Sequence, residues 1–276
     1  MKRPIVWAWV GAAVALVLAA LSFDPRLFTG GDNATYYALA EALATGRGYV
    51  DLIAPGHPPH AVYPPGYPAF LVPFYWLFSG SIVGIKAASL VAGAVVLWAT
   101  WRVARRDPAV PAWAAAAAVG LVGLYPVFLD YAHWVLSEMT YLAVTLLAIG
   151  AFLGAEGYPA GPAGDDGEGS EADGWTGSWT IGLGLALASF LVRTAGLALL
   201  LAALLHALLK RRWRRAGAAA GVTAVGVVPW LLWTSAHAPA TGSYLEQLLA
   251  SNRHDPQSPP ISMSEFLQRI GENLAH

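Results

Sequence analysis

The segment Gly31-Asp32-Asn33-Ala34-Thr35-Tyr36-Tyr37 is the first long polar interruption in a strongly apolar chain. It follows the apolar run Ile5–Phe23, whose length of about 19 residues is sufficient to cross a bilayer as a helix. Lys2 and Arg3 precede that run and favour a cytoplasmic N-terminus. We therefore expect Gly31–Tyr37 to lie outside the membrane. A cleaved signal peptide ending near Ala19–Ser22 is an alternative for the first run.

The composition indicates a polytopic membrane protein. Of the 276 residues, 57% are hydrophobic and 12% are charged, whereas about 25% of the residues in a typical soluble domain are charged. The mean hydropathy is +0.51. The chain contains no cysteine, which excludes disulfides and thiolate metal sites. Its basic runs flank apolar segments, so they indicate membrane topology and no nucleic-acid binding.

The apolar segments predict an all-α fold with about seven transmembrane helices. Pro65–Phe78 is too short to span comfortably and contains Pro73, so we expect an interfacial or re-entrant helix there. The long run Thr180–Leu209 is interrupted by Arg193-Thr194. The predicted spans are Ile5–Phe23, Ile82–Trp101, Pro111–Phe128, Leu136–Leu153, two halves of Thr180–Leu209, and Ala216–Ser235.

The basic clusters Lys2-Arg3, Arg102–Arg106 and Lys210–Arg215 test this layout. Each should face the cytoplasm, so an even number of crossings must separate neighbouring clusters. The second and third clusters are separated by one hairpin and by Thr180–Leu209. That run must therefore cross twice or not at all. Splitting it at Arg193 gives two short helices that meet near the outer side of the membrane. The chain then has seven spans in total, and its C-terminus lies on the outer side.

One transmembrane module is expected over residues 1–235, with a first outer loop at 24–81 and an acidic cytoplasmic loop at 155–178. Helical spacing of apolar residues predicts an amphipathic helix from Asp32 to Thr45 in the first loop. Residues 236–276 are expected to begin a further outer loop, with an amphipathic helix candidate at Ser264–Leu274.

Several ionisable residues fall on the outer side in this topology. Such groups are costly at membrane depth and usually mark a functional site or a partner pair. Asp32 can instead serve only as a helix N-cap, and Glu138 can be a structural partner of Arg193. Asp130 and His133, in the turn between spans three and four, are considered for substrate binding. The alternatives are an exposed position for Asp130 and an interfacial position for His133.

The first loop also carries aromatic and imidazole side chains that we consider for substrate binding: Tyr36, Tyr37, His57, His60, Tyr63 and Tyr67. Interfacial packing is the alternative for the tyrosines, and an ordinary loop position is the alternative for the histidines. A zinc site built from Asp32, His57 and His60 does not have a recognised ligand spacing. Lys86 is expected to snorkel or to form a pair near the start of span two.

Three motifs of the first loop resemble those of GT-C glycosyltransferases: Asp32-x3-Tyr36-Tyr37-x2-Ala40-x2-Leu43, Gly46-x-Gly48-Tyr49, and Tyr63-Pro64-Pro65-Gly66-Tyr67-Pro68. They are most similar to the prokaryotic relatives of protein O-mannosyltransferases and aminoarabinose transferases, which use polyprenyl-phosphate sugars. Later segments follow in the family's order, namely Leu136-Ser137-Glu138, Gly184 to Arg193-Thr194-Ala195-Gly196, and Val228-Pro229-Trp230.

The resemblance implies an integral-membrane glycosyltransferase of a prokaryotic inner or plasma membrane, with Asp32 as general base and an extracytoplasmic active site. Arg193 is the candidate for holding the donor phosphate. Glu138 can orient the acceptor, position Arg193 or help to hold a divalent metal ion. The implied partners are a polyprenyl-phosphate sugar donor, membrane lipids, and a lipid, glycan or protein acceptor. Family members continue with further spans, so we expect a short form or an N-terminal fragment.

Two other classes of function are compatible with the same sequence. A transporter or flippase would explain the intramembrane residues Glu138 and Arg193, although no internal repeat is visible. A non-catalytic membrane assembly partner is the third alternative.

Overall fold

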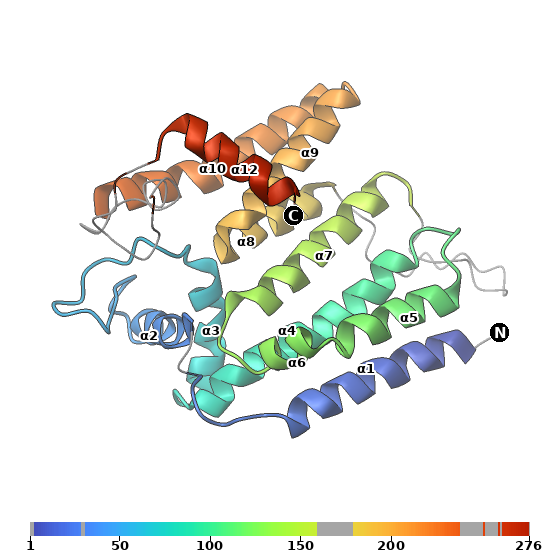
Figure 1. The fold of residues 1–276 in the computed structure, drawn as a ribbon, viewed down its shortest axis with the longest axis horizontal. Coiled ribbons are helices and arrows are strands. Elements are labelled where there is room, and N and C mark those ends of the chain that lie inside the picture. The colour runs from blue at the N-terminus through green and yellow to red at the C-terminus, as the bar shows by residue number, and fades with distance from the viewer. Residues whose placement is uncertain are drawn as a thin grey trace.

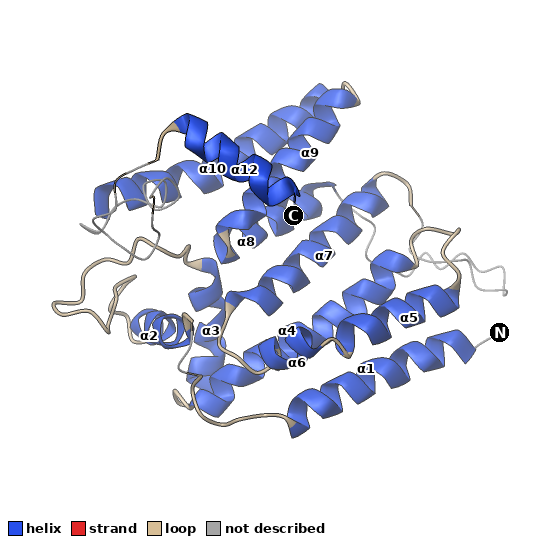
Figure 2. Ribbon diagram, in the orientation of Figure 1, coloured by secondary structure: helices blue, strands red, loops and turns tan. Residues whose placement is uncertain are grey.

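The computed structural model describes residues 3–28, 31–158, 179–237, 251, 259 and 261–275. Its regular elements are helical, and one isolated β-bridge joins Val50 to Pro59 (Figure 2). The elements are α1 (Arg3–Leu21), α2 (Asn33–Ala44), α3 (Gly66–Leu77), α4 (Ile82–Ala104), α5 (Ala112–Gly123), α6 (Pro126–Tyr131), α7 (Ser137–Ala155), α8 (Trp179–Val192), the 3₁₀ turn η1 (Thr194–Gly196), α9 (Leu197–Leu209), α10 (Trp213–His237) and α12 (Met263–Ala275). The prediction of an all-α fold is confirmed.

The apolar helices form a bundle with two distinct ends (Figure 1). Helix α7 packs against both α4 and α8, and so joins the α1, α4 and α5 group to the α8, α9 and α10 group. One end carries α2 and α3, and we call it the loop end. The other end carries the turns after α4 and α9, where Arg102–Arg106 and Lys210–Arg215 lie, and we call it the basic end.

The chain is a polytopic membrane protein. In the described residues, α4, α7 and α10 are long and apolar enough to cross a membrane. Four shorter apolar helices accompany them: Trp9–Leu21 of α1, Ala112–Gly123, Trp179–Val192 and Thr194–Leu209. These seven segments correspond to the seven predicted spans. All of them run between the loop end and the basic end, as the even number of crossings requires (Figure 1).

The predicted span Pro111–Phe128 is wrong in one respect, because it is two helices. Helix α5 ends at Gly123, and α6 begins at Pro126. Proline lacks a backbone N–H and disfavours the helical conformation of the residue before it. Tyr125 accordingly has an extended backbone, with φ −67° and ψ 126°. The chain bends there, at the loop end of the bundle.

The predicted break at Arg193 is confirmed. Helix α8 ends at Val192, Arg193 is extended with φ −154°, and α9 begins at Leu197. Gly196 allows this tight reversal, because a Cβ at that position would lie 2.3 Å from the Phe190 backbone nitrogen. The turn lies at the loop end of the bundle. Helix α8 ends there, and α9 begins there and runs back toward the basic end.

The first loop packs onto the bundle through α2 and α3, whose bounds agree closely with the predicted helices Asp32–Thr45 and Pro65–Phe78. Buried apolar residues of α2, α3 and α4 form one cluster with Val192 of α8. A Cβ on Gly66 would lie 2.5 Å from the Leu191 carbonyl carbon. The first turn of α3 therefore contacts the end of α8 backbone to backbone.

Lys86 of α4 is fully buried, so it does not snorkel as one of the sequence alternatives proposes. Its ammonium group donates to the backbone carbonyls of Asp24, at 2.6 Å, and Arg26. A buried ammonium requires such acceptors because its loss of hydration is costly. Lys86 thus fixes the segment between α1 and α2, which leads to Asp32.

At the basic end, Glu156 follows α7 and pairs with Arg212 and with Arg215, the latter at 2.7 Å. This contact joins the end of α7 to the turn between α9 and α10. Most of the predicted acidic loop (residues 159–178) lies outside the described residues, as do most residues of 238–260. Helix α12 coincides with the amphipathic helix predicted at Ser264–Leu274.

Replacing Gly66 with alanine should separate α3 from α8, because the added methyl group would meet backbone atoms that cannot rotate away. We expect a loss of unfolding free energy of about 1–3 kcal/mol, measured by thermal unfolding of the detergent-solubilised protein. Gly184→Ala is the matched control, since nothing lies within 4 Å of a Cβ at that position. Equal stability of the two variants would contradict the close packing of α3 on α8.

Candidate active site at the loop end

Asp32 lies at the N-cap position of α2, but its carboxylate makes no capping hydrogen bond. The backbone carbonyl of Asp32 accepts the Tyr36 N–H at 2.9 Å and begins the helix. The side chain is half-buried and is not required to satisfy the helix terminus. The carboxylate is therefore available to other partners, unlike that of an Asp that serves only as a cap.

The Tyr63 hydroxyl lies against this carboxylate. Burial, followed by the hydrogen bond to Asp32 and by the negative charge of Asp32, raises the pKa of Tyr63. The phenol is consequently neutral and can donate to the carboxylate, which only accepts. The Tyr63 ring also packs on Tyr36, with 4.9 Å between ring centroids. Asp32 thus lies beside a pair of tyrosines from two parts of the first loop.

Ser137, fully buried at the start of α7, connects α2 to the break between α8 and α9. Its Oγ accepts from the Tyr36 hydroxyl and from Arg193 Nη1, each at 3.3 Å. Burial is the main cause that raises the pKa of Tyr36 to about 12. Tyr36 therefore remains a protonated donor at neutral pH, and its ring holds a fixed position beside Asp32.

Arg193 forms an ion pair with Glu138, with 2.6 Å between Nη1 and Oε1. The side chains of Arg193 and Glu138 are 42% and 31% exposed, so the pair is open on one side. Glu138 Oε2 is buried and has no hydrogen-bond partner. The guanidinium has five N–H donors in a planar fork, and Ser137 and Glu138 are contacted through Nη1 alone. Arg193 can therefore bind a further anion.

The charges of Asp32 and Arg193 act on the same two tyrosines. Asp32 raises the pKa of Tyr36 and of Tyr63, and Arg193 lowers both. The Glu138 charge acts on Tyr36 as well. The structure thus brings the three main sequence candidates to one place, around Tyr36, although they come from α2, α7 and the turn between α8 and α9.

Two apolar cavities lie toward the loop end of the bundle. One, of about 430 Å³, lies between α5, α6 and α7, and Glu138 is part of its lining. The other, of about 380 Å³, lies between the first loop, α8 and α10, where Tyr49, Pro65 and Trp233 contribute to its wall. Both cavities are large enough to hold part of a hydrocarbon chain.

Other first-loop candidates lie outside the center of this cluster. Tyr67 is fully buried, edge-on to Tyr36 at 4.8 Å, and supports that ring from within the core. The Tyr37 hydroxyl donates to the Gly80 carbonyl at 2.7 Å, in the turn between α3 and α4. His57 is exposed and has a φ of 48°. None of these three side chains contacts Asp32 or Arg193 in the described part of the chain.

Asp130 and His133 belong to a different region. Asp130 is exposed on α6, whereas His133 is buried and packs against Phe23, with 6.1 Å between ring centroids. The charges that act on His133 are those of Lys86, Asp130 and Asp24. These two predicted site residues therefore lie near the segment that follows α1.

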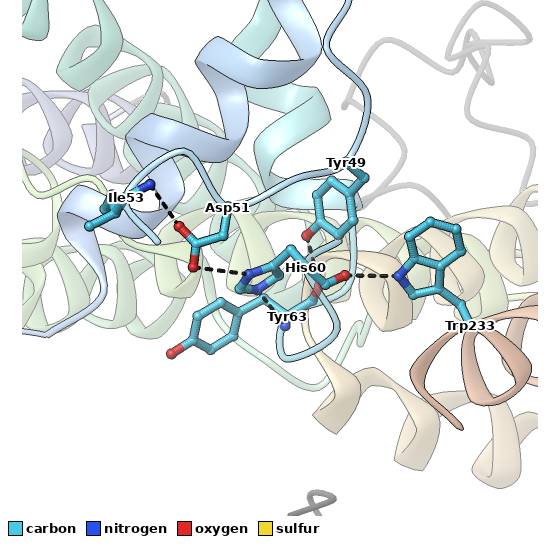
Figure 3. Close-up of polar contacts among 6 residues, drawn as sticks. All are labelled: Tyr49, Asp51, Ile53, His60, Tyr63 and Trp233. Carbon is cyan, nitrogen blue, oxygen red and sulfur yellow. Dashed lines mark hydrogen bonds and ion pairs between the residues drawn. The ribbon is translucent and has the colours of Figure 1, made fainter. Parts of the chain in front are cut away.

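His60 is buried within the first loop, where its ring and backbone contact several segments (Figure 3). Its Nε2 accepts the Tyr63 N–H at 3.1 Å, and Nδ1 lies 3.9 Å from Asp51 Oδ2. Its carbonyl accepts from Trp233 Nε1 at 2.8 Å, which joins the loop to α10. Unlike His57, it supports the segment that carries Tyr63.

Among the described side chains, no three His, Asp or Glu residues come together to hold a metal ion. The zinc site considered for Asp32, His57 and His60 does not form, because His57 is exposed and His60 is buried with its Nε2 already bound to the Tyr63 N–H. The described residues therefore do not fit a metal site made of protein ligands alone.

Two residues that connect the site were given no role from the sequence, although Ser137 belongs to the motif Leu136-Ser137-Glu138. Ser137 is the shared partner of Tyr36 and Arg193, and its only sequence signal is its place beside Glu138. Asn33 is fully buried, and its Oδ1 accepts the Val135 N–H at 2.8 Å. The sequence around Asn33 does not indicate this contact, because Val135 lies 102 positions further along the chain.

The fold is similar to that of ArnT from Cupriavidus metallidurans, solved as a crystal structure in the apo state. The TM-score is 0.58 and the sequence identity is 23%. The similarity covers 85% of this chain and 43% of ArnT, so the chain spans less than half the length of that protein. No family model and no curated protein matches the sequence. The likeness shows that the two chains share a fold over this region.

The unfolding free energies of Ser137 and Glu138 variants should show which of the two residues stabilises the fold. Ser137→Ala leaves the buried Tyr36 hydroxyl without its acceptor, so we expect a loss of about 1–3 kcal/mol of unfolding free energy. Glu138→Gln disrupts a half-exposed ion pair and should cost less than about 1 kcal/mol. Thermal unfolding in detergent measures both. A much larger loss for Glu138→Gln would show that the ion pair is mainly structural.

Proposed function

We propose that this chain is a glycosyltransferase module that transfers a sugar from a polyprenyl-phosphate donor, with Asp32 as general base. The observation that carries the proposal is that Tyr36, one turn after Asp32 on α2, shares the Ser137 hydroxyl with Arg193. Transfer from a sugar phosphate needs an acceptor for one proton and a cation for the leaving phosphate. A carboxylate and an arginine that share one site can supply both.

In the proposed reaction, Asp32 takes the proton from the acceptor hydroxyl while that oxygen attacks the anomeric carbon. The bond between the anomeric carbon and the phosphate oxygen breaks, and the polyprenyl phosphate leaves with the electron pair. Arg193 stabilises the negative charge that develops on the phosphate. The family resemblance implies that this displacement inverts the anomeric configuration.

Supporting residues fix the two reactive groups. Tyr63 donates to Asp32 and limits the directions in which the carboxylate can accept a proton. Glu138 orients the Arg193 guanidinium, while the remaining donors of the fork stay available to a phosphate. Ser137 holds Tyr36 and Arg193 at a fixed separation.

The apolar cavities suit a lipid-linked donor. A polyprenyl chain needs an apolar surface that continues from the phosphate site into the hydrocarbon region of the membrane. The cavity of about 380 Å³ lies beside Pro65 and between α8 and α10, close to the α8 end that precedes Arg193. By the positive-inside rule, the basic end faces the cytoplasm and the reaction takes place on the extracytoplasmic side.

Asp32→Asn should abolish transfer while leaving the fold intact, because the amide keeps the shape of the side chain but cannot take the proton. We expect the rate to fall by about 10²–10⁴-fold, measured with a radiolabelled polyprenyl-phosphate sugar in proteoliposomes. Asp130→Asn, an exposed carboxylate at the same end, is the control and should retain the wild-type rate. Near-normal transfer by Asp32→Asn would refute the base assignment. Sugar-lipid uptake without transfer by the wild type would instead favour a transporter.

Arg193→Lys should weaken binding of the donor phosphate, since lysine keeps the charge but loses the planar fork. We expect the dissociation constant for polyprenyl phosphate to rise by about tenfold or more, the equivalent of about 1.4 kcal/mol. Titration of the protein in nanodiscs with polyprenyl phosphate measures this change. Arg26→Gln removes an exposed cation of the first loop and should leave the affinity unchanged. Equal losses in both variants would indicate only nonspecific attraction of the anion.

A further inference from the structure

His60 contacts several other residues through its ring and its backbone (Figure 3). Its backbone N–H donates to the Tyr49 carbonyl at 2.9 Å, and its carbonyl accepts from Trp233 of α10. Its ring lies between two others, edge-on to Tyr49 at 5.6 Å and stacked on Tyr63 at 5.3 Å. The side chain thus occupies a closed position next to the residue that donates to Asp32.

The hydrogen bonds fix the protonation state of this ring. Nε2 accepts the Tyr63 backbone N–H, so Nε2 cannot carry a proton while that bond exists. In the neutral ring the proton is then on Nδ1, on the side of Asp51. The Asp51 carboxylate is itself held, because its Oδ1 accepts the Ile53 N–H at 3.0 Å.

We propose that His60 is a positioning residue that keeps Tyr63 on Asp32 only while its imidazole is neutral, and that protonation releases this segment and slows the reaction. The effect on the rate rests on the proposed function, whereas the release of the segment does not. A protonated Nε2 would point a second N–H at the Tyr63 N–H, and two donors repel each other. Tyr63 would then leave its place, and Asp32 would lose its phenol partner.

The direction of the pH dependence follows from the surroundings of the ring. Burial lowers the pKa of His60 from its usual value of 6.5, and the charges of Asp51 and Asp32 oppose this shift. The ring also faces Tyr49 and Tyr63, both neutral because burial raises the pKa of each, while Trp233 of α10 contacts the His60 backbone carbonyl. The unfolded chain therefore binds the proton more readily than the folded one. The stabilising contribution of the neutral ring is present above pH 6.5 and is lost as the pH falls below that value.

Hydrogen exchange of the Tyr63 amide tests the release directly and needs no substrate. The measured quantity is the protection factor, which is the intrinsic exchange rate divided by the observed rate. For the wild-type protein in nanodiscs, the protection factor of this amide should be at least about tenfold lower at about pH 5 than at about pH 7.5. His60→Gln should protect it at both pH values, because the amide oxygen can replace Nε2 as acceptor and does not titrate. His57→Gln, in the exposed part of the same loop, should behave as the wild type.

Constant protection of the Tyr63 amide in the wild type, or equal loss of protection in His60→Gln, would overturn the proposal. The wild-type series alone decides the first outcome, even if His60→Gln does not fold. Transfer assays supply the second readout: the loss of kcat on acidification should begin at a higher pH in the wild type than in His60→Gln, because both proteins need an unprotonated general base but only the wild type also needs a neutral His60. If no variant transfers sugar but protection depends on pH as expected, the proposed function fails while the role of His60 in holding Tyr63 stands.

Discussion

The contact between Gly66 and the end of α8 determines where the first loop meets the turn between α8 and α9. Only a residue without a side chain allows the α3 backbone to come this close to Leu191 and Val192. Because α3 follows directly after Tyr63, this contact places the first loop beside the turn that carries Arg193. The turn itself leaves backbone groups outside regular helix, which a membrane protein tolerates only where protein or water covers them. The first loop provides such a cover.

The electrostatics of the site depend on the same arrangement. An arginine in an apolar bundle needs a counter-charge, and Glu138 supplies it from the first turn of α7. The pair is half-exposed, so Arg193 keeps access to solvent and to a second anion. In the described part of the chain Asp32 forms no ion pair with Arg193, and both charges act on Tyr36 and Tyr63. A carboxylate in direct contact with Arg193 would be a poorer base, since the cation would stabilise its charged form.

Some of the fold follows from sequence patterns with a direct physical meaning. Charge parity required Thr180–Leu209 to cross twice or not at all, and the observed break falls at the interruption Arg193-Thr194. The sequence prediction treated Pro111–Phe128 as one span, because the apolar run has a suitable length for a crossing. It did not take into account that Pro126 starts a new helix. Lys86 was expected to snorkel or to form a pair. Its acceptors are backbone carbonyls, which have no sequence signature.

The sequence by itself determined that this is an all-α membrane protein, which residues form most of its helices, and that Asp32, Glu138 and Arg193 belong to one end of the bundle. These properties depend on local hydrophobicity and on charge position, which can be counted along the chain. The tertiary structure decided which of the residues at that end share a site. It joined Ser137 to Tyr36 and Arg193, buried Tyr67, moved His133 to another region and made His60 a support for Tyr63. Such contacts depend on helix packing and on side-chain direction over long sequence separations, and no pattern within a single segment encodes them.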